Sequence, residues 1–317
     1  MKLIPTDSTL FFSRQDPDDP RLGDWAKPWR AGEPLSADAF VIAGYPDDEG
    51  IRINGGRPGA AQAPKAVRKP LYKMTPSLFS EKAIQIFDAG DFDPTAGELG
   101  QRHEAGTKLA TEVLSKGAKW ITIGGGHDYG FADADAFLSS TRSMRPIVFN
   151  FDAHLDVRPT TKGLSSGTPF FRMLEKHRDF DFCEIGIQAH CNSKKHVEWL
   201  EARGAKVITQ EEVLASGTSL RDFTIKSLGD DLLKRRPAFI SVDIDGFSST
   251  VAPGCSQSWA TGFMPNEFFP LFELLLSRFD VRALGIYEVS PPLDQDDRTS
   301  KLAAQIIHQF MFGEVNV

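Results

Sequence analysis

Short apolar runs recur along this chain at intervals long enough for a helix, and this spacing limits the folds that the chain can adopt. The runs are rich in Val, Ile and Phe rather than strictly alternating, which is typical of strands buried on both faces of a sheet. The segments between them are long enough for parallel crossovers. We therefore predict an α/β fold, a three-layer α/β/α arrangement around a mostly parallel sheet of about eight strands. The predicted strands are residues 39–45, 83–90, 119–126, 146–152, 182–188, 205–209, 238–245 and 282–289.

Amphipathic segments between these runs predict the helices. In the segment 102–117, Leu109, Val113 and Leu114 share one face, and Gly117 is a typical stop signal. Further helices are expected near residues 193–203, 219–235, 265–279 and 299–312.

The chain shows no internal repeat and no linker that would divide it into several domains. Residues 1–36 are rich in Pro, Asp and Trp and have no clear period, so we expect them to form a segment that wraps the surface or an interface. Residues 37–317 are expected to form a single domain.

Charge and composition exclude several classes of partner. The net charge is -7 and Lys and Arg are scattered, so the chain carries no electrostatic footprint for nucleic acid. Residues 1–20 lack the apolar core of a signal peptide, and no apolar stretch is long enough to span a bilayer. Cys183, Cys191 and Cys255 lack the CxxC spacing of a zinc ribbon and do not suggest a disulfide framework. We expect a cytoplasmic protein with small-molecule or protein partners.

Potential metal ligands follow four of the predicted strands, at the point where each apolar run ends. Ligands bind outside the carboxyl ends of strands in open parallel sheets, and residues two apart on an extended chain share a face. These side chains are therefore expected to converge. They are His127; Asp152, His154 and Asp156; Asp243 and Asp245; and Glu288.

The first six of these residues form a carboxylate-rich set without a thiolate, which suits manganese-like divalent ions better than a structural zinc site. Four carboxylates balance the charge of two divalent ions, whereas one ion would leave about two negative charges uncompensated. Two ions can hold a bridging water as hydroxide near neutral pH, which predicts a hydrolase.

Structural explanations compete with this interpretation. A lone Asp at a strand end is usually a helix cap or a turn residue, and it is the joint occurrence that favours a site. The run "GGGHDYG" lacks the Lys and the hydroxyl residue of a Walker motif, so its glycines are expected to let the backbone pass close to the ligands. Polar surroundings suggest surface positions for four histidines, and Cys183 is expected in the core. These histidines are His103, His177, His196 and His308.

The motifs resemble those of the ureohydrolase family, which includes arginase, agmatinase and formimidoylglutamase. The resemblance covers the chain from about residue 40 to its end and is carried by "GGGHDYG", "FDAHLD", "SVDIDGFSSTVAPG" and "YEVSPPLDQDDRTSKLAA". It implies an arginase-like fold and a centre of two manganese ions. One ion would be bound by His127, Asp152, Asp156 and Asp243, and the other by Asp152, His154, Asp243 and Asp245.

Details within the family favour the formimidoylglutamase branch. The segments 53–71 and 156–171 are similar to that branch, as is "VAPGCS". Arginases carry a catalytic histidine near the position of Phe170, and this chain has none there; Ser248 replaces an Asp found in many relatives. The expected reaction is attack of a metal-bridging hydroxide on N-formimidoyl-L-glutamate, giving L-glutamate and formamide. Asp156 is expected to shuttle a proton and Glu288 to recognise the amidine group.

The substrate's carboxylates predict cationic and polar partners on the neighbouring loops. Arg57 and Arg158 are candidates for a bidentate clamp, although each also fits a surface salt bridge. Asn54, Thr168, Gln188 and Asn192 are further candidates, and His190 is expected to be a solvated loop residue. Two alternatives stay open: a guanidino-group hydrolase that releases urea, such as guanidinobutyrase, agmatinase or arginase, and a catalytically silent metal-binding protein. The family resemblance also suggests a homo-oligomer.

Overall fold

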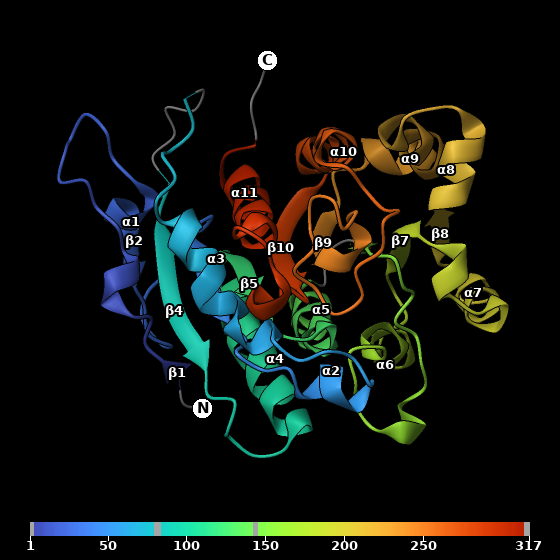
Figure 1. Cartoon of the computed structure of the whole chain (residues 1–317), viewed down its shortest axis with the longest axis horizontal. Coiled ribbons are helices and arrows are strands. Elements are labelled where there is room, and N and C mark those ends of the chain that lie inside the picture. Colours follow the sequence, from blue (N-terminus) through green and yellow to red (C-terminus); the bar gives the residue numbers. More distant parts are fainter. Residues whose placement is uncertain (1–2, 79–83, 142–144, 314–317) are drawn as a thin grey trace.

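A computed structural model describes residues 3–78, 84–141 and 145–313, and it places helices on both faces of one central sheet (Figure 1). The strands of this sheet are β1 Leu3–Ile4, β2 Ala26–Pro28, β3 Phe40–Gly44, β4 Ile86–Phe92, β5 Lys119–Ile123, β6 Ile147–Phe151, β7 Asp181–Ile187, β8 Lys206–Thr209, β9 Pro237–Asp243 and β10 Asp280–Tyr287. The α-helices are α1 Leu22–Trp25, α2 Glu49–Ile53, α3 Ala63–Leu71, α4 Leu99–Ser115, α5 Gly130–Ser140, α6 Pro169–Lys176, α7 Lys194–Glu201, α8 Gln210–Ser216, α9 Leu220–Leu228, α10 Pro265–Arg278 and α11 Arg298–Phe312.

The strand order is β1-β4-β3-β5-β10-β9-β6-β7-β8, with β2 also paired to β4. All pairings are parallel except that of β1 with β4. The predicted three-layer, mostly parallel α/β architecture is therefore confirmed, and the eight predicted strands are all present. Within the described ranges the sheet has 10 strands, which is more than expected, because β1 and β2 extend it.

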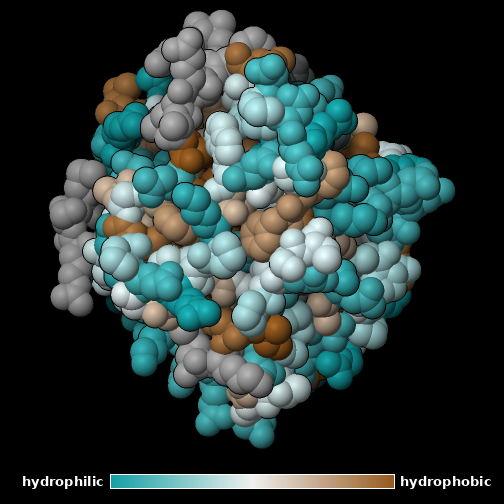
Figure 2. Space-filling model, turned by 90° about the vertical axis from the view of Figure 1, so that its left-hand side faces the viewer, coloured by the Kyte–Doolittle hydropathy of each residue, from teal (hydrophilic) through white to brown (hydrophobic). Residues whose placement is uncertain are grey.

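The two additional strands lie within residues 1–36 and pair with opposite ends of β4. They were missed because two or three residues are too short to show a period. The division of the chain at residue 36 stays a prediction, although part of the first segment belongs to the sheet. Figure 2 shows the face of the molecule on the side of α1, β2 and β4, where hydrophobic residues are interspersed with hydrophilic ones.

The core consists of two apolar clusters, one on each face of the sheet. Alternation along β3 illustrates the division, because Phe40 and Ile42 point into one cluster and Val41 and Ala43 into the other. The first cluster includes side chains of α3, α10 and α11, and the second includes those of α4, α5 and α6. Strands buried on both faces require such apolar residues at every position, which explains the continuous runs in the sequence.

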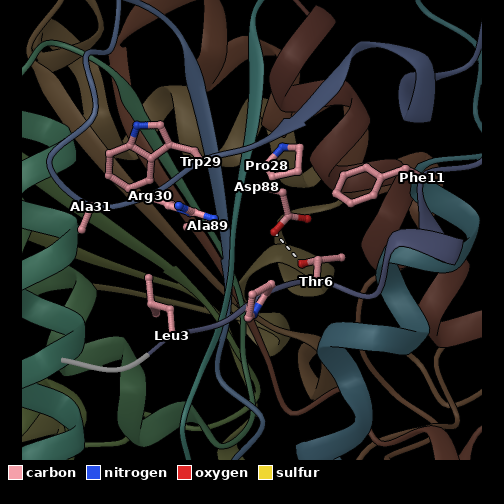
Figure 3. Close-up of a pocket in the computed structure, with 10 residues that line it drawn as sticks. Leu3, Thr6, Phe11, Pro28, Trp29, Arg30, Ala31, Asp88 and Ala89 are labelled. Carbon is pink, nitrogen blue, oxygen red and sulfur yellow. Dashed lines mark hydrogen bonds between the residues drawn. The ribbon is translucent and has the colours of Figure 1, made fainter.

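A cavity of about 330 Å³ lies beside β4 at the edge formed by the N-terminal segment (Figure 3). Leu3, Phe11 and Trp29 contribute to its apolar lining, and the carboxylate of Asp88 accepts a hydrogen bond from Thr6. None of its lining residues belongs to the predicted metal-ligand set. Among the described residues, no helix is both long and apolar enough to cross a membrane.

Candidate metal centre

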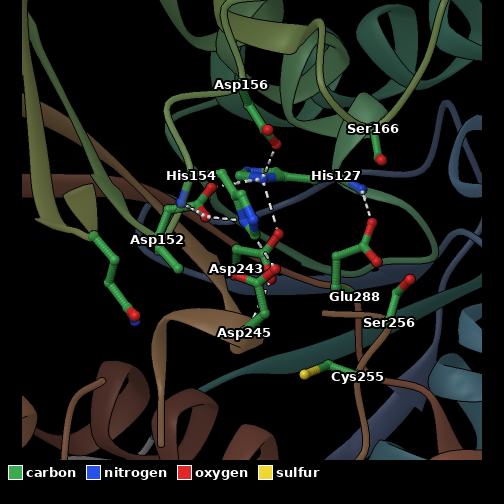
Figure 4. Close-up of polar contacts among 12 residues, drawn as sticks. His127, Asp152, His154, Asp156, Ser166, Asp243, Asp245, Cys255, Ser256 and Glu288 are labelled. Atoms are coloured by element: carbon green, nitrogen blue, oxygen red, sulfur yellow. Dashed lines mark hydrogen bonds and ion pairs between the residues drawn. The ribbon is translucent and has the colours of Figure 1, made fainter. Parts of the chain in front are cut away.

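The six predicted ligands converge at the carboxyl edge of the sheet, where Figure 4 shows them pointing toward one another. His127 opens the short 3-10 helix after β5, and Asp152 directly follows β6. Asp243 is the last residue of β9, and Asp245 lies in the 3-10 turn that follows. We call His127, Asp152, His154, Asp156, Asp243 and Asp245 the acid–histidine cluster.

The first part of the cluster is centred on the imidazole of His127, which is fully buried. Its Nδ1 lies 3.1 Å from Asp152 Oδ2, 3.0 Å from Asp156 Oδ2 and 3.1 Å from Asp243 Oδ2. None of these contacts has hydrogen-bond geometry, so Nδ1 has no hydrogen-bond partner among the residues that the structure describes. One nitrogen and three oxygens thus face a common point without being bonded to one another.

The second part of the cluster is centred on His154, whose side chain is 18% exposed. Its Nδ1 lies 3.1 Å from Asp245 Oδ2 and 3.5 Å from Asp152 Oδ1. Asp152 therefore contributes one oxygen to each part and is the residue that they share. Asp243 belongs to the first part, while its Oδ1 accepts a hydrogen bond from the Asp245 backbone at 2.8 Å. Its expected bridging role stays a prediction.

Burial and mutual repulsion make the cluster attractive to positive charge. Burial raises the pKa of Asp243 well above its usual range, and the nearby Asp245 and Asp152 raise it further. The pKa of Asp156 is raised by burial and by Asp152. Burial also raises the pKa of Asp245, to about 6, although His154 opposes this effect. Buried carboxylates of this kind require either protons or metal ions as partners.

The donor set fits a pair of divalent cations. Both parts combine an imidazole nitrogen with carboxylate oxygens, and within each part the candidate donor atoms lie within 4.8 Å of one another. Among the described residues, neither the Nδ1 of His127 nor the buried Oδ1 of Asp245 has a hydrogen-bond partner, so both atoms are free to bind a metal ion. Oxygen-rich sites with imidazole and no thiolate suit Mn²⁺.

Glu288 lies beside this cluster but outside both of its parts. Its Oε1 accepts a hydrogen bond of 3.0 Å from the backbone N–H of His127. Both Glu288 and Asp156 adopt positive φ angles, 64° and 47°, which residues with a Cβ rarely adopt. Such conformations cost about 1–3 kcal/mol and are frequent at functional sites.

The glycines of the run "GGGHDYG" allow close packing. Gly130 lies against the ligand His127 as expected, since a Cβ there would be 3.0 Å from its ring, whereas Gly124 and Gly125 pack against other residues. A Cβ on Gly125 would lie 1.6 Å from the carbonyl oxygen of Asp47, and one on Gly124 would lie 2.5 Å from the ring of Tyr287. The loop after β5 therefore packs closely against β10 and against the loop after β3. The tight packing positions His127, whose ring stacks on Tyr287 at 4.9 Å between centroids.

The predicted substrate-binding residues on the outer loops already contact one another or the backbone. The exposed Arg158 donates from Nη1 to Asn54 Oδ1 at 2.5 Å, and Asn54 in turn donates to Ser166 Oγ. Arg57 donates from Nε and Nη2 to the carbonyl oxygen of Ser256 and from Nη2 to that of Cys255. Arg57 thus anchors the loop after β9, whereas the side chain of Arg158 makes one hydrogen bond to the described residues, that to Asn54.

The other three predicted substrate-binding residues stabilise the loops that surround the site. Thr168 Oγ1 donates to the carbonyl oxygen of Ser165 at 2.8 Å. Asn192 bonds the backbone of the segment 153–155, and Gln188 exchanges hydrogen bonds with Thr261. Their contact with substrate stays a prediction, as does that of Asn54, Arg57 and Arg158. His190 is exposed and Cys183 is fully buried, as expected.

The surface position predicted for His103 is wrong. Its side chain is fully buried, with Nε2 at 2.7 Å from Asp128 Oδ2 and Nδ1 at 2.8 Å from Arg172 Nη1. Because Arg172 can only donate, Nδ1 accepts and Nε2 carries the proton that Asp128 accepts. The partners come from the loop after β5 and from α6, so the polar composition of α4 alone gave no sign of this burial.

Polar residues that were not predicted from the sequence lie directly beneath the cluster. Asn150 donates to Asp152 Oδ2 at 3.2 Å and to Glu184 Oε2 at 2.8 Å, and Ser241 Oγ lies 2.9 Å from His127 Nε2. The alternation of side chains along a strand could have revealed two of them. Asn150 and Ser241 stand two positions before a predicted ligand and therefore share its face.

Comparison with known proteins identifies the family of this chain. The family model described as the arginase family matches residues 38–313. A formimidoylglutamase of Aeromonas hydrophila is 30% identical over 98% of this chain and 99% of its own length. One of Clostridium tetani is 30% identical over 84% of this chain and 80% of its own. The crystal structure of Trypanosoma cruzi formiminoglutamase with Mn²⁺ superposes with a TM-score of 0.80 at 29% identity, covering 94% of this chain and 99% of that one. The chain therefore belongs to the arginase family.

Proposed function

We propose that this protein hydrolyses N-formimidoyl-L-glutamate to L-glutamate and formamide. The observation that carries the proposal is the cluster in which Asp152 joins two groups of potential ligands, with the carboxylate of Glu288 beside them. The names of the Aeromonas hydrophila and Clostridium tetani relatives support this substrate. A cytoplasmic location and a homo-oligomeric state belong to the same proposal; the three free cysteines support the former.

Two manganese ions are the proposed cofactor, as in the Trypanosoma cruzi structure. His127, Asp152, Asp156 and Asp243 would hold one ion, and Asp152, His154, Asp243 and Asp245 the other. The four carboxylates of this set balance the charge of two divalent ions. When bound, such a pair lowers the pKa of a water molecule toward neutrality and thereby supplies the nucleophile.

Asp156 is proposed to move the proton. Its carboxylate lies at the edge of the cluster, with Oδ2 3.0 Å from His127 Nδ1, and its backbone carbonyl accepts from the Phe170 N–H. This backbone contact and the positive φ fix the direction of the side chain. Asp156 would accept the proton of the attacking water and deliver it to the leaving nitrogen, the α-nitrogen of glutamate.

Glu288 is proposed to bind the cationic amidine. Its Oε1 is already occupied by the His127 N–H, whereas Oε2 makes no hydrogen bond to the described residues. An amidinium N–H can donate to Oε2, and burial of the carboxylate strengthens this charge-assisted bond. Because Oε1 contacts the His127 backbone, the bound amidine would lie next to the nucleophile.

The two carboxylates of the substrate are proposed to contact Arg158 and Asn54 at the outer side of the site. Arg158 is exposed and its guanidinium has free donors beyond the bond to Asn54. Arg57 remains a candidate with fewer free donors, because Nε and Nη2 already donate to backbone carbonyls. Both arginines would repel the ammonium group of agmatine.

A substrate panel with separate detection of formamide and urea tests the proposal. Manganese-loaded protein would be assayed with N-formimidoyl-L-glutamate, L-arginine, agmatine and 4-guanidinobutyrate. We expect formamide from the first compound and little urea from the others. Efficient release of urea without formamide would contradict the substrate but not the metal centre. Metal binding without turnover of any compound would indicate the silent metal-binding protein instead.

A further inference from the structure

A row of polar side chains runs across the sheet directly beneath the acid–histidine cluster. Asn150 on β6 is in register with Glu184 on β7 and with Ser241 on β9. All three side chains are fully buried in the middle of a sheet whose other positions are mainly apolar. Because Asn150 and Ser241 precede Asp152 and Asp243 by two residues, the row and these two ligands lie on the same face.

The proposed reaction uses none of these three residues, and of the three only Glu184 makes no hydrogen bond to a predicted ligand among the described residues. Its Oε2 accepts from Asn150 Nδ2 at 2.8 Å, while its Oε1 and the Oδ1 of Asn150 are buried without a hydrogen-bond partner in the described part of the chain. A buried polar group without a partner destabilises a fold by about 1–3 kcal/mol. Stability of the sheet therefore does not explain a carboxyl group at this position, where an apolar side chain would pack as well.

The contacts of Asp152 indicate what Glu184 does. Asp152 Oδ1, on the His154 side, accepts from the His154 backbone N–H at 2.7 Å. Asp152 Oδ2, 3.1 Å from His127 Nδ1, accepts from Asn150 Nδ2. The same amide nitrogen donates to Glu184, so Glu184 and Asp152 are its two acceptors. Glu184 thereby fixes the plane of the Asn150 amide and directs its second N–H to Asp152 Oδ2.

We propose that Glu184 is a positioning residue of the metal centre, acting through Asn150 on the oxygen of Asp152 that faces His127. This inference rests on the proposed function, because it concerns the binding of the two ions. Partners of metal ligands usually change metal affinity by about 10–100-fold when they are removed. Since Asp152 Oδ1 is held independently by the backbone, the effect of Glu184 falls on one ion only.

Metal binding by two matched variants tests the inference without measuring activity. Glu184→Met removes the acceptor at similar size, and Glu184→Gln keeps an oxygen that accepts from Asn150. Apoprotein would be titrated with Mn²⁺, free Mn²⁺ measured by electron paramagnetic resonance, and both dissociation constants fitted. For Glu184→Met, one constant should rise by about 10-fold or more and the other stay within about twofold. Glu184→Gln should retain both wild-type constants to within about threefold.

Thermal unfolding of the apoproteins separates this role from a structural one. Glu184→Met apoprotein should melt at or above the wild-type temperature, since a half-partnered buried carboxyl group is replaced by an apolar side chain. If Glu184→Met does not fold, Asn150→Ser tests the same contact, because serine is too short to reach both carboxylates. We expect the same increase in a single dissociation constant.

The outcomes distinguish the two proposals. Wild-type protein that binds no manganese would overturn the proposed function together with this inference. Wild-type protein that binds two ions, with both constants unchanged or equally raised in the folded variant, would overturn the role of Glu184 alone. If one Mn²⁺ dissociation constant also rises in Glu184→Gln, the negative charge of Glu184 attracts the ion directly. This result would also contradict positioning through Asn150.

Discussion

Replacing Glu288 by Gln should remove amidine recognition and leave metal binding intact. Gln keeps a carbonyl oxygen that can accept from the His127 N–H, so the 3.0 Å contact and the loop geometry should persist. The charge is lost, and hydrogen bonds to charged groups contribute about 1.5–3 kcal/mol. This range corresponds to a decrease in kcat/KM by about 10- to 150-fold. The manganese content should not change, because Glu288 lies outside both parts of the cluster.

The assay is steady-state release of formamide from N-formimidoyl-L-glutamate, together with metal analysis of the same samples. Glu33→Gln is a matched control, since the exposed Glu33 also accepts a backbone N–H, that of Arg30 at 3.1 Å, and lies far along the sequence from the cluster. Its kinetics should equal those of the wild type. Unchanged kcat/KM in Glu288→Gln would refute the proposed role of Glu288. Loss of manganese from this variant would show that Glu288 contributes to the metal site instead.

Three further predictions address the ligands, the pH dependence and the substrate. Asp243→Ala should abolish activity and the rise in Tm that Mn²⁺ gives to the wild type, as measured by thermal unfolding with and without metal; a full Tm rise would exclude Asp243 as a ligand. Because burial raises the pKa of Asp245 to about 6 and only its unprotonated form binds a cation, this Mn²⁺-dependent rise in Tm should be present above that pH and diminish as the pH falls through it. A rise that is constant down to pH 5 would contradict this. Arg158→Ala should raise KM for the glutamate substrate more than Arg57→Ala, since Arg57 is held by backbone carbonyls, and equal KM values in Arg158→Ala and wild type would exclude the clamp.

The metal-ligand candidates could be predicted because their positions follow from local sequence. Each apolar run ends where its strand ends, and parallel strands bring their carboxyl ends to one edge of the sheet. His127, Asp152 and Asp243 therefore lie together although they are far apart in the chain. The same reasoning explains why the eight longer strands were found and why β1 and β2, with only two and three residues, were not.

Residues whose role depends on contacts between distant segments could not be assigned in this way. Arg57 donates to carbonyl groups about 200 positions away in the chain, whereas its sequence surroundings suggested only a substrate clamp or a surface salt bridge. His103 is buried by partners from two other elements. Glu184 becomes notable only when the register of β6 and β7 places it opposite Asn150, and strand register is set by tertiary packing.

Two metal ions that share Asp152 can be located by anomalous diffraction at the manganese absorption edge. Crystals of the protein grown with Mn²⁺ should show two anomalous peaks about 3.5–4 Å apart, the separation typical of two-metal hydrolytic sites. One peak should contact His127, the other His154, and both should contact Asp152. A single peak, or two peaks of which only one contacts Asp152, would contradict a binuclear centre that shares this carboxylate.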